Sequence, residues 1–174
     1  MTTIQIRPAT IDDAAQLSIL ATTVFSATYG EIIPPDTLQK HLEEQLSVNA
    51  LSVDLADSST HYLVAHHNET LIGFSKLSPT HPPSTLRSTK SIEMVKLYVA
   101  SAYHGFGVGA KLMKRSLSEA RELGDESIWL CVWEKNERAI AFYRKWGFEQ
   151  VGTIDILVGD VVFDDLVLEK RLDW

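Results

Sequence analysis

Three glycines at alternate positions stand where an apolar strand gives way to a helix. Gly105, Gly107 and Gly109 follow the apolar run 92–99, which has the composition of a strand buried on both faces. Glycine permits positive φ and the close approach of another molecule. The apolar positions of residues 108–120 then recur at near-helical spacing. A helix that begins in such a turn presents unpaired amide N–H groups and a positive dipole end, and such an end binds phosphate.

The spacing of these glycines differs from two known nucleotide motifs. Gly-x-Gly-x-Gly is neither the Gly-x-Gly-x-x-Gly fingerprint of dinucleotide-binding folds nor the loop that ends in Gly-Lys-Ser/Thr. Two interpretations therefore stay open at this point. The glycines form either a site for a phosphate-bearing ligand or a tight surface turn without one.

Length and composition are those of one globular domain, which we expect to span residues 1–174. The 174 residues are 45% hydrophobic and 22% charged. They contain no apolar run of about 18 or more, so we expect no contact with a membrane. The first seven residues lack a basic-then-apolar leader, and the single cysteine, Cys131, excludes an internal disulfide. These features predict a cytoplasmic protein.

The net charge of −7 disfavours a nucleic-acid partner, and the charge is unevenly distributed. Residues 104–145 hold 8 Lys and Arg against 6 Asp and Glu, while the remaining residues hold 8 against 17. Positive charge is thus concentrated around the glycine turn. The acidic remainder either draws a cationic substrate or is an ordinary solvated surface.

Hydrophobic periodicity predicts an alternation of strands and helices. A hairpin is expected where two strand-like runs flank Asn68-Glu69-Thr70. Strands are expected at residues 4–6, 61–67, 71–77, 92–99, 127–132 and 161–168. Helices are expected from Thr10 to a point within 22–30, from Pro34 to Leu46, from the glycine turn to about Gly124, and over 139–146. Residues 78–90, with three prolines, predict a loop, and residues 47–57 show no clear pattern.

No set of side chains has the spacing of a metal site. His66 and His67 are neighbours in an expected strand, so their side chains point to opposite faces and do not chelate one ion. Cys131 stands inside an apolar run without a histidine nearby in the sequence. It is therefore predicted to be a core residue rather than a nucleophile.

Two separate stretches together resemble a known pair of motifs. The first is Leu97-Tyr-Val-x3-Tyr-His-Gly-x-Gly-x-Gly109, and the second is Trp133-x2-Asn-x2-Ala-x2-Phe-Tyr-x3-Gly-Phe148. At this separation they resemble the acetyl-CoA-binding motifs of the GNAT superfamily of N-acetyltransferases. The opening, Ile6-Arg-Pro-Ala-Thr-x-Asp-Asp-Ala14, is likewise similar to how such chains begin. The resemblance covers nearly the whole chain in order.

One departure from the family pattern concerns the residue before the first glycine. This chain has His104 where the family usually has Gln or Arg, and it has Ser101 where proline is common. Histidine still offers a backbone N–H and, when protonated, a positive charge. The resemblance therefore continues to predict a cofactor site here.

The resemblance implies that the chain binds acetyl-CoA as a cosubstrate, without a metal ion, and that different groups contact different parts of the cofactor. The amides of residues 104–110 suit the pyrophosphate, and the strand before them offers backbone groups to the pantetheine arm. Asn136 is a cofactor contact or, alternatively, only a helix cap. The implied cofactor-binding residues are Leu97, Tyr98, Val99, His104, Gly105, Phe106, Gly107, Val108, Gly109, Ala110, Asn136 and Tyr143.

The resemblance also assigns the chemistry. Periodicity alone places Tyr143 in the apolar stripe of its helix, but in the family such a phenol faces the thiol and stabilises it as it leaves. A substrate ammonium must lose a proton before it attacks the thioester. Glu93, an acid in the central strand, is a candidate base and substrate contact, or else merely a solvated strand start. Tyr29 is a further candidate for binding the substrate.

The sequence therefore predicts an α/β (α+β) fold with a mixed, mostly antiparallel, twisted sheet flanked by helices, as in GNAT enzymes. The predicted activity is direct transfer of an acetyl group from acetyl-CoA to a primary amine. Three segments resemble bacterial acetyltransferases of the spermidine/spermine kind, namely Phe25-x2-Thr-Tyr29, the Pro34-Pro35 start and the Gly159-Asp-x3-Asp-Asp-Leu-x-Leu168 ending. The expected substrate is therefore a small molecule, with a polyamine as the candidate. The alternatives are a protein or peptide amine acetyltransferase, or a non-catalytic CoA-binding regulatory module. Family members are commonly dimers, so a homodimer is expected.

Overall fold

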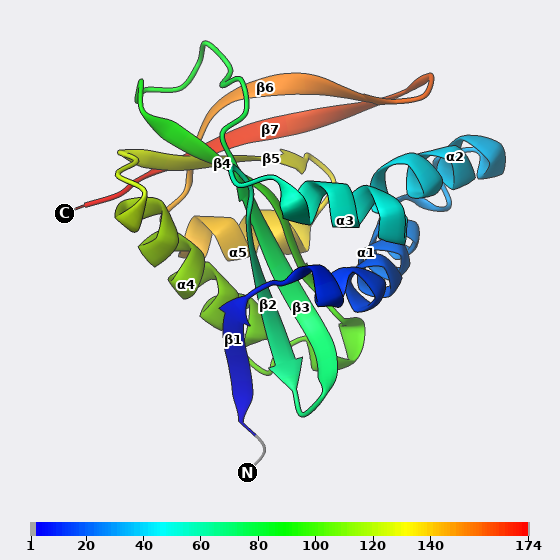
Figure 1. The fold of residues 1–174 in the computed structure, drawn as a ribbon. Coiled ribbons are helices and arrows are strands. Elements are labelled where there is room, and N and C mark those ends of the chain that lie inside the picture. The colour runs from blue at the N-terminus through cyan, green and yellow to red at the C-terminus, as the bar shows by residue number, and fades with distance from the viewer. Residues whose placement is uncertain (1–2, 174) are drawn as a thin grey trace. The chain divides into compact units, whose positions relative to one another are not determined.

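The computed structural model describes residues 3–173 and shows a chain of alternating strands and helices (Figure 1). The first part of the chain contains β1 (Ile4–Pro8), η1 (Ile11–Asp13), α1 (Ala14–Tyr29), α2 (Pro35–Leu46), α3 (Val48–Ala56), β2 (His61–His67) and β3 (Thr70–Ser78). The second part contains β4 (Ser91–Val99), η2 (Ser101–Tyr103), α4 (Val108–Glu122), β5 (Ser127–Trp133), α5 (Glu137–Lys145), β6 (Glu149–Val158) and β7 (Val161–Arg171).

The strands form one sheet in the order β1-β2-β3-β4-β5-β7-β6. β4 pairs with β5 in parallel, whereas β1 with β2, β2 with β3, β5 with β7 and β6 with β7 are antiparallel. The predicted fold class, a mixed and mostly antiparallel sheet flanked by helices, is confirmed. The chain divides into two compact units, one made of the residues up to Leu77 with Lys96–Ser116, the other of Ser78–Val95 with the chain from Leu117 on. A single domain over residues 1–174 stays a prediction, and residues 1, 2 and 174 lie outside the described part.

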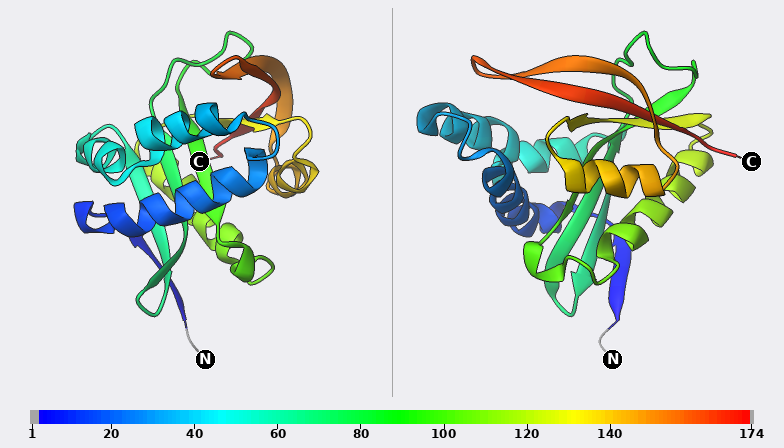
Figure 2. Two further views of the ribbon diagram at one scale, coloured as in Figure 1. Left: turned by 90° about the vertical axis from the view of Figure 1, so that its right-hand side faces the viewer. Right: turned by 180° about the vertical axis from the view of Figure 1, so that it is seen from behind.

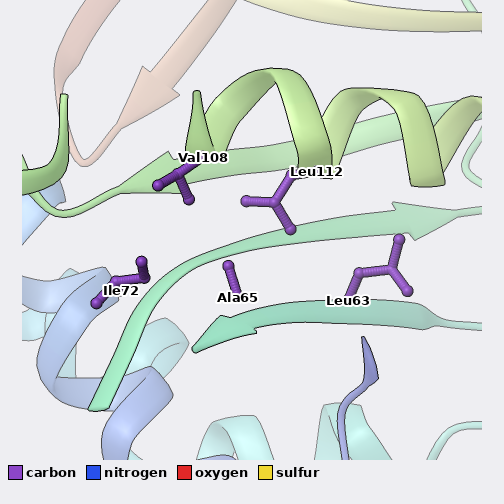
Figure 3. Close-up of a cluster of buried hydrophobic side chains, with 5 residues drawn as sticks. All are labelled: Leu63, Ala65, Ile72, Val108 and Leu112. Atoms are coloured by element: carbon purple, nitrogen blue, oxygen red, sulfur yellow. The ribbon is translucent and has the colours of Figure 1, made fainter. Parts of the chain in front are cut away.

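The core of the first unit fixes where α4 begins. Val108 and Leu112, in the first two turns of α4, point at side chains of β2 and β3 (Figure 3). Their buried partners are Leu63, Ala65 and Ile72. All of these side chains are at most 2% exposed, and Leu97 and Val99 of β4 pack against the same cluster. Burying an aliphatic side chain stabilises by about 1.5–3 kcal/mol, so this cluster holds the helix start firmly against the strands.

Two small residues of β3 let α4 approach closely. A Cβ at Gly73 would lie 3.0 Å from the Tyr98 carbonyl oxygen and 3.1 Å from side-chain atoms of Val108 and Leu112, so only glycine fits without a shift. Two residues on, the hydroxyl of Ser75 bonds that of Ser116 on α4 at 2.8 Å, and both serines are fully buried. Each hydroxyl satisfies the other in a position without water.

The second unit contains a long hairpin and the short helix α5. β6 and β7 pair along nearly their whole length, and Figure 2 shows them as one twisted hairpin in orange and red. β7 also pairs with β5 from Ser127↔Arg171 to Trp133↔Asp165. The buried carboxylate of Glu169 accepts hydrogen bonds from the Ser127 hydroxyl and from two amides of the 79–90 loop. The loop is thereby attached to the strands.

Most of the expected elements are confirmed, and two were missed. The hairpin at Asn68, the loop after β3 and the helix ends at Gly124 and Gly147 lie where predicted, with positive φ at all three named residues. α3 and β6 were not predicted, because neither has a clean apolar period. α3 begins at Ser47, whose side chain accepts a hydrogen bond from the Ala50 amide, and β6 is defined by its pairing with β7.

One expectation about burial was wrong. β4 was expected to be buried on both faces, but only Ile92 and Met94 are, and the rest of the strand is half-buried. Glu93 and Lys96 explain part of this result, because burying a charged group in an apolar layer is costly. In α5 the predicted stripe around Phe142 and Tyr143 is half-buried, and Ile140 is the buried side chain.

Candidate functional site

The glycine turn has the backbone that its sequence predicts at two of its three positions. Gly105 and Gly107 have φ of 84° and 79°, in the left-handed region that glycine favours. An added Cβ at either position would meet nothing within 4 Å, so the turn is open on that side. Gly109 lies inside the first turn of α4 and has no positive φ. The turn conformation therefore does not explain why this position is glycine.

The amides of this turn divide into two groups. Those of His104 and Phe106 donate to the carbonyl oxygens of Ser101 and Tyr103, at 3.2 and 3.4 Å. Among residues 3–173, no acceptor is found for the amides of Gly105, Gly107, Val108, Gly109 and Ala110. These five N–H groups lie at the positive end of the α4 dipole, which is where an anion is stabilised.

The side chain of His104 also supports the turn, which sequence reasoning did not foresee. Its Nε2 lies 2.9 Å from the carbonyl oxygen of Val99. A carbonyl only accepts, so Nε2 donates, and this bond fixes which ring nitrogen carries a proton. The contact joins the end of β4 to the glycine turn. It also occupies one lone pair of a carbonyl that the resemblance assigned to the pantetheine arm.

The other predicted cofactor residues of the first unit lie beside this turn. Leu97 and Val99 direct their side chains to the core cluster, so backbone groups are what they offer a ligand. The Tyr98 ring packs edge-on against Phe74, with ring centroids 5.3 Å apart. Phe106 is 70% exposed at the tip of the turn. Leu97 and Val99 therefore leave only their backbone groups for the predicted cofactor contact, whereas Phe106 leaves its ring exposed.

Tyr29, the predicted substrate residue of the first unit, ends α1. Its ring packs against Phe25, with centroids 4.7 Å apart, and Phe25 in turn stacks on His41. Burial lowers the pKa of His41, and the Lys96 charge lowers it further. This aromatic group is half-buried apart from Phe25, and a role for Tyr29 in substrate binding stays a prediction.

Asn136 and Tyr143 both lie on α5, in the second unit. The Asn136 side chain accepts a hydrogen bond from the Ala139 amide at 3.3 Å, so it caps the helix. Tyr143 follows after seven residues, about two helical turns, on the same side of the helix. Its ring lies between those of Phe142 and Phe148, with centroid distances of 5.6 and 5.7 Å. These contacts fix the ring plane while leaving the residue half-buried.

Glu93, the candidate base, has a specific neighbour that the sequence did not predict. Its Oε2 accepts a hydrogen bond from the Thr80 hydroxyl at 2.5 Å, and Thr80 belongs to the 79–90 loop. In the parallel register Glu93 is opposite Trp129 of β5. A carboxylate held in this way has a defined orientation, which a base or a cation-binding group requires.

Cys131, predicted to be a core residue, is only half-buried, and its thiol is neutral. Burial, followed by the charges of Glu93 and Asp165, raises its pKa to about 12. A thiol with that pKa has a negligible thiolate fraction at neutral pH. Both carboxylates therefore disfavour the thiolate form of Cys131.

Asp165 lies in one of the segments that resemble spermidine/spermine acetyltransferases, but no role was predicted for it from the sequence. It lies on β7 and is 9% exposed, and burial, with a smaller effect from Asp164, raises the pKa of its carboxyl to about 6. The signal in the sequence was an acidic pair, Asp164-Asp165, inside an otherwise apolar strand. One of two adjacent strand residues must face the buried side.

Neither a metal site nor a membrane-spanning helix is found in the described part of the chain. Within residues 3–173, no group of three or more His, Cys, Asp or Glu side chains is placed to hold a metal ion. In the same range no helix is both long and apolar enough to cross a membrane.

Comparison with known proteins gives consistent results. An uncharacterized N-acetyltransferase of Mycobacterium bovis is 29% identical over 160 residues, which are 92% of this chain and 98% of that protein. The N-alpha-acetyltransferase RimI of Mycobacterium tuberculosis is 33% identical over 121 residues, which cover 64% of this chain and 70% of RimI. The crystal structure of the PaiA N-acetyltransferase of Thermoplasma acidophilum, in complex with coenzyme A, has a similar fold, with a TM-score of 0.80. It is 24% identical and covers 97% of this chain and 99% of its own.

The strongest of these findings is a match to a whole family. Residues 24–148 match the acetyltransferase (GNAT) family, and this range contains both motifs that the sequence analysis singled out. The match spans well over half of the chain and agrees with the nearly full-length relative from Mycobacterium bovis. The chain therefore belongs to the acetyltransferase (GNAT) family and is an acetyl-CoA-dependent N-acetyltransferase.

Proposed function

We propose that this enzyme acetylates a primary amine of a small molecule and holds acetyl-CoA by the amides at the start of α4. The observation that carries the cofactor site is the set of five amides without an acceptor among residues 3–173, at the positive end of a helix. A pyrophosphate would satisfy several of them at once. The coenzyme A bound to the similar Thermoplasma acidophilum enzyme supports this choice of ligand.

We propose two further sets of cofactor contacts, one in each unit. The backbone of β4 from Leu97 to Val99 would pair with the amide groups of the pantetheine arm, as an added strand does. Asn136 keeps its side-chain amide N–H groups for a ligand while its oxygen caps α5. When bound, the thioester supplies an activated acetyl group, and no acyl-enzyme is required.

The catalytic step needs one base and one group that stabilises the leaving thiolate. In our proposal Glu93 accepts a proton from the substrate ammonium, directly or through water, and thereby frees the nitrogen lone pair. The nitrogen attacks the thioester carbonyl carbon, a C–N bond forms and the C–S bond breaks. The Tyr143 hydroxyl donates a hydrogen bond or its proton to the departing sulfur. Cys131, held as a neutral thiol, takes no part in this transfer.

The proposal also names the chemical class of the amine that accepts the acetyl group. A polyamine fits the acidic remainder of the chain, where residues outside 104–145 hold 17 Asp and Glu against 8 Lys and Arg. The similarity to RimI, an N-alpha-acetyltransferase, favours a peptide amine as the second candidate. A homodimer and a cytoplasmic location stay predictions, of which the first is tested by light scattering of the purified protein.

Acetylation of a panel of amines tests the proposed function. We expect the purified protein to release coenzyme A from acetyl-CoA when polyamines are added, with little release for a peptide N-terminus or without an amine. Thiol release and mass spectrometry of the product measure this. Efficient transfer only to peptides would move the assignment to the second candidate, and coenzyme A affinity without amine-dependent release would contradict both.

The glycine turn gives a prediction about cofactor affinity. Gly107→Ala places a side chain at a φ of 79°, which costs about 1–2 kcal/mol and should shift the neighbouring amides. The strain itself is shared by the free and bound enzyme, so the expected rise in the KM for acetyl-CoA, roughly tenfold for a loss of about 1.4 kcal/mol of binding energy, comes from the displaced amides. Gly159→Ala is the control, since Gly159 has a positive φ of 58° in the β6–β7 turn. An equal KM for both variants would show that the amides of the α4 turn do not bind the cofactor.

Removal of the Tyr143 hydroxyl should act on turnover. Tyr143→Phe keeps the ring between Phe142 and Phe148 but removes the donor, so kcat should fall by about 10²-fold with both KM values nearly unchanged. Tyr62→Phe is the matched control, because the Tyr62 hydroxyl donates to Asp54 elsewhere in the first unit. Steady-state kinetics at saturating acetyl-CoA measure both variants. Full turnover in Tyr143→Phe means that the phenol has no catalytic role.

Glu93→Gln should change how the rate depends on pH. A general base works only when deprotonated, so kcat/KM of the wild type should fall as the pH drops through the pKa of the base. The variant should be much slower and lose this acidic limb. Glu149→Gln, which removes an exposed carboxylate bonded to Arg87 at 2.6 Å, should leave the profile unchanged. A profile of Glu93→Gln parallel to that of the wild type assigns the proton transfer to another group.

A further inference from the structure

Asp165 is a buried carboxyl group that the fold itself does not use. It is 9% exposed, and within residues 3–173 its side chain makes no hydrogen bond and no ion pair. Other buried acids of the chain are paired: Asp13 with Arg7, and Glu169 with Ser127 and two loop amides. An unpaired buried carboxylate is costly. Its presence therefore calls for a partner that comes from outside the chain.

The strand registers place Asp165 and Glu93 on one face of the sheet. Glu93 of β4 is opposite Trp129 of β5, and Trp133 of β5 is opposite Asp165 of β7. Trp129, Cys131 and Trp133 alternate along β5, so they share a face with the residues opposite them. Glu93, Cys131 and Asp165 consequently lie on a diagonal across three neighbouring strands.

The separation of the two acids follows from sheet geometry. They are two strands and four residues apart, so their Cα atoms lie roughly 16 Å apart, given ~4.8 Å between strands and ~3.3 Å per residue. The thiol of Cys131 lies between them, and both charges act on its pKa. The pKa of Asp165, raised to about 6, leaves it mostly ionised at neutral pH.

We propose that Asp165 is a specificity-determining residue that binds a second ammonium group of the substrate, while Glu93 faces the nitrogen that is acetylated. This inference rests on the proposed function and narrows its substrate to an extended aliphatic diamine or polyamine. A flexible methylene chain would lie over Cys131, whose neutral thiol suits an apolar chain. A peptide N-terminus, with a single ammonium group, would leave Asp165 unpaired.

Two amines of similar chain length test the proposal kinetically. Spermidine has an ammonium group at each end, whereas octylamine has only one. Asp165→Asn should raise the KM for spermidine about tenfold or more and leave the KM values for octylamine and acetyl-CoA unchanged. The matched control is Asp164→Asn, because Asp164 is adjacent but exposed on the opposite face, and it should change none of these values. Equal effects of Asp165→Asn on both amines, or no effect on spermidine, would overturn the proposal.

A binding measurement separates this inference from the proposed function. Spermidine alone, without acetyl-CoA, should raise the Tm of the wild type and of Asp164→Asn but not that of Asp165→Asn. If the wild type transfers no acetyl group yet shows this pattern, the proposed reaction is wrong and the subsite stands. If spermidine shifts wild type and Asp165→Asn equally, the subsite is wrong whatever the enzyme acetylates.

The stability of the free protein gives a third readout. Folding raises the pKa of the Asp165 carboxyl from 3.8 to about 6. Asp165 therefore adds to the free energy of unfolding at low pH, where it is protonated, and this contribution is lost as the pH rises through about 6. Asp165→Asn should therefore have the Tm of the wild type near pH 4 and a higher Tm at pH 8. A lower Tm of the variant at pH 8 would show that the carboxylate has a partner within the protein and would overturn the proposal.

Discussion

The proposed cofactor site depends on holding the first turn of α4 in place while its amides stay unpaired. An isolated helix start frays, and its free N–H groups would be solvated rather than fixed in direction. Here Val108 and Leu112 are buried against β2 and β3, and Gly73 lets the helix come close enough for that contact. The His104 ring ties the turn back to β4. Apolar packing on one side of the helix thus orients a polar surface on the other.

In the second unit, three acidic side chains differ in the hydrogen bonds that hold them. Thr80 orients Glu93, and Glu169 accepts hydrogen bonds from Ser127 and from two loop amides. Asp165 is also buried, but within residues 3–173 it has no such partner. The thiol between Glu93 and Asp165 stays protonated because burial and both charges raise its pKa. This arrangement suits direct transfer to a cationic amine better than nucleophilic catalysis by cysteine.

The success of sequence-based prediction follows the strength of the local pattern. β2, β3 and α4 combine a clear period with glycines or turn residues at their ends, and their positions were predicted correctly. β6 contains Gly152, Thr153 and Asp155 and is a strand because β7 supplies its hydrogen bonds, which no local pattern encodes. The extent of burial in β4 was overestimated for a similar reason, since exposure depends on what packs on each face.

The sequence by itself determined the family, the position of the glycine turn before α4 and the choice of Tyr143, Asn136 and Glu93 as candidate residues, because these depend on residue type and local spacing. Tertiary structure alone decided which amides remain free, that the His104 ring donates to Val99, and that Glu93 and Asp165 share one face about Cys131. Strand register sets this last arrangement. Register is a relation between segments far apart in the chain, so no periodicity within one segment reveals it.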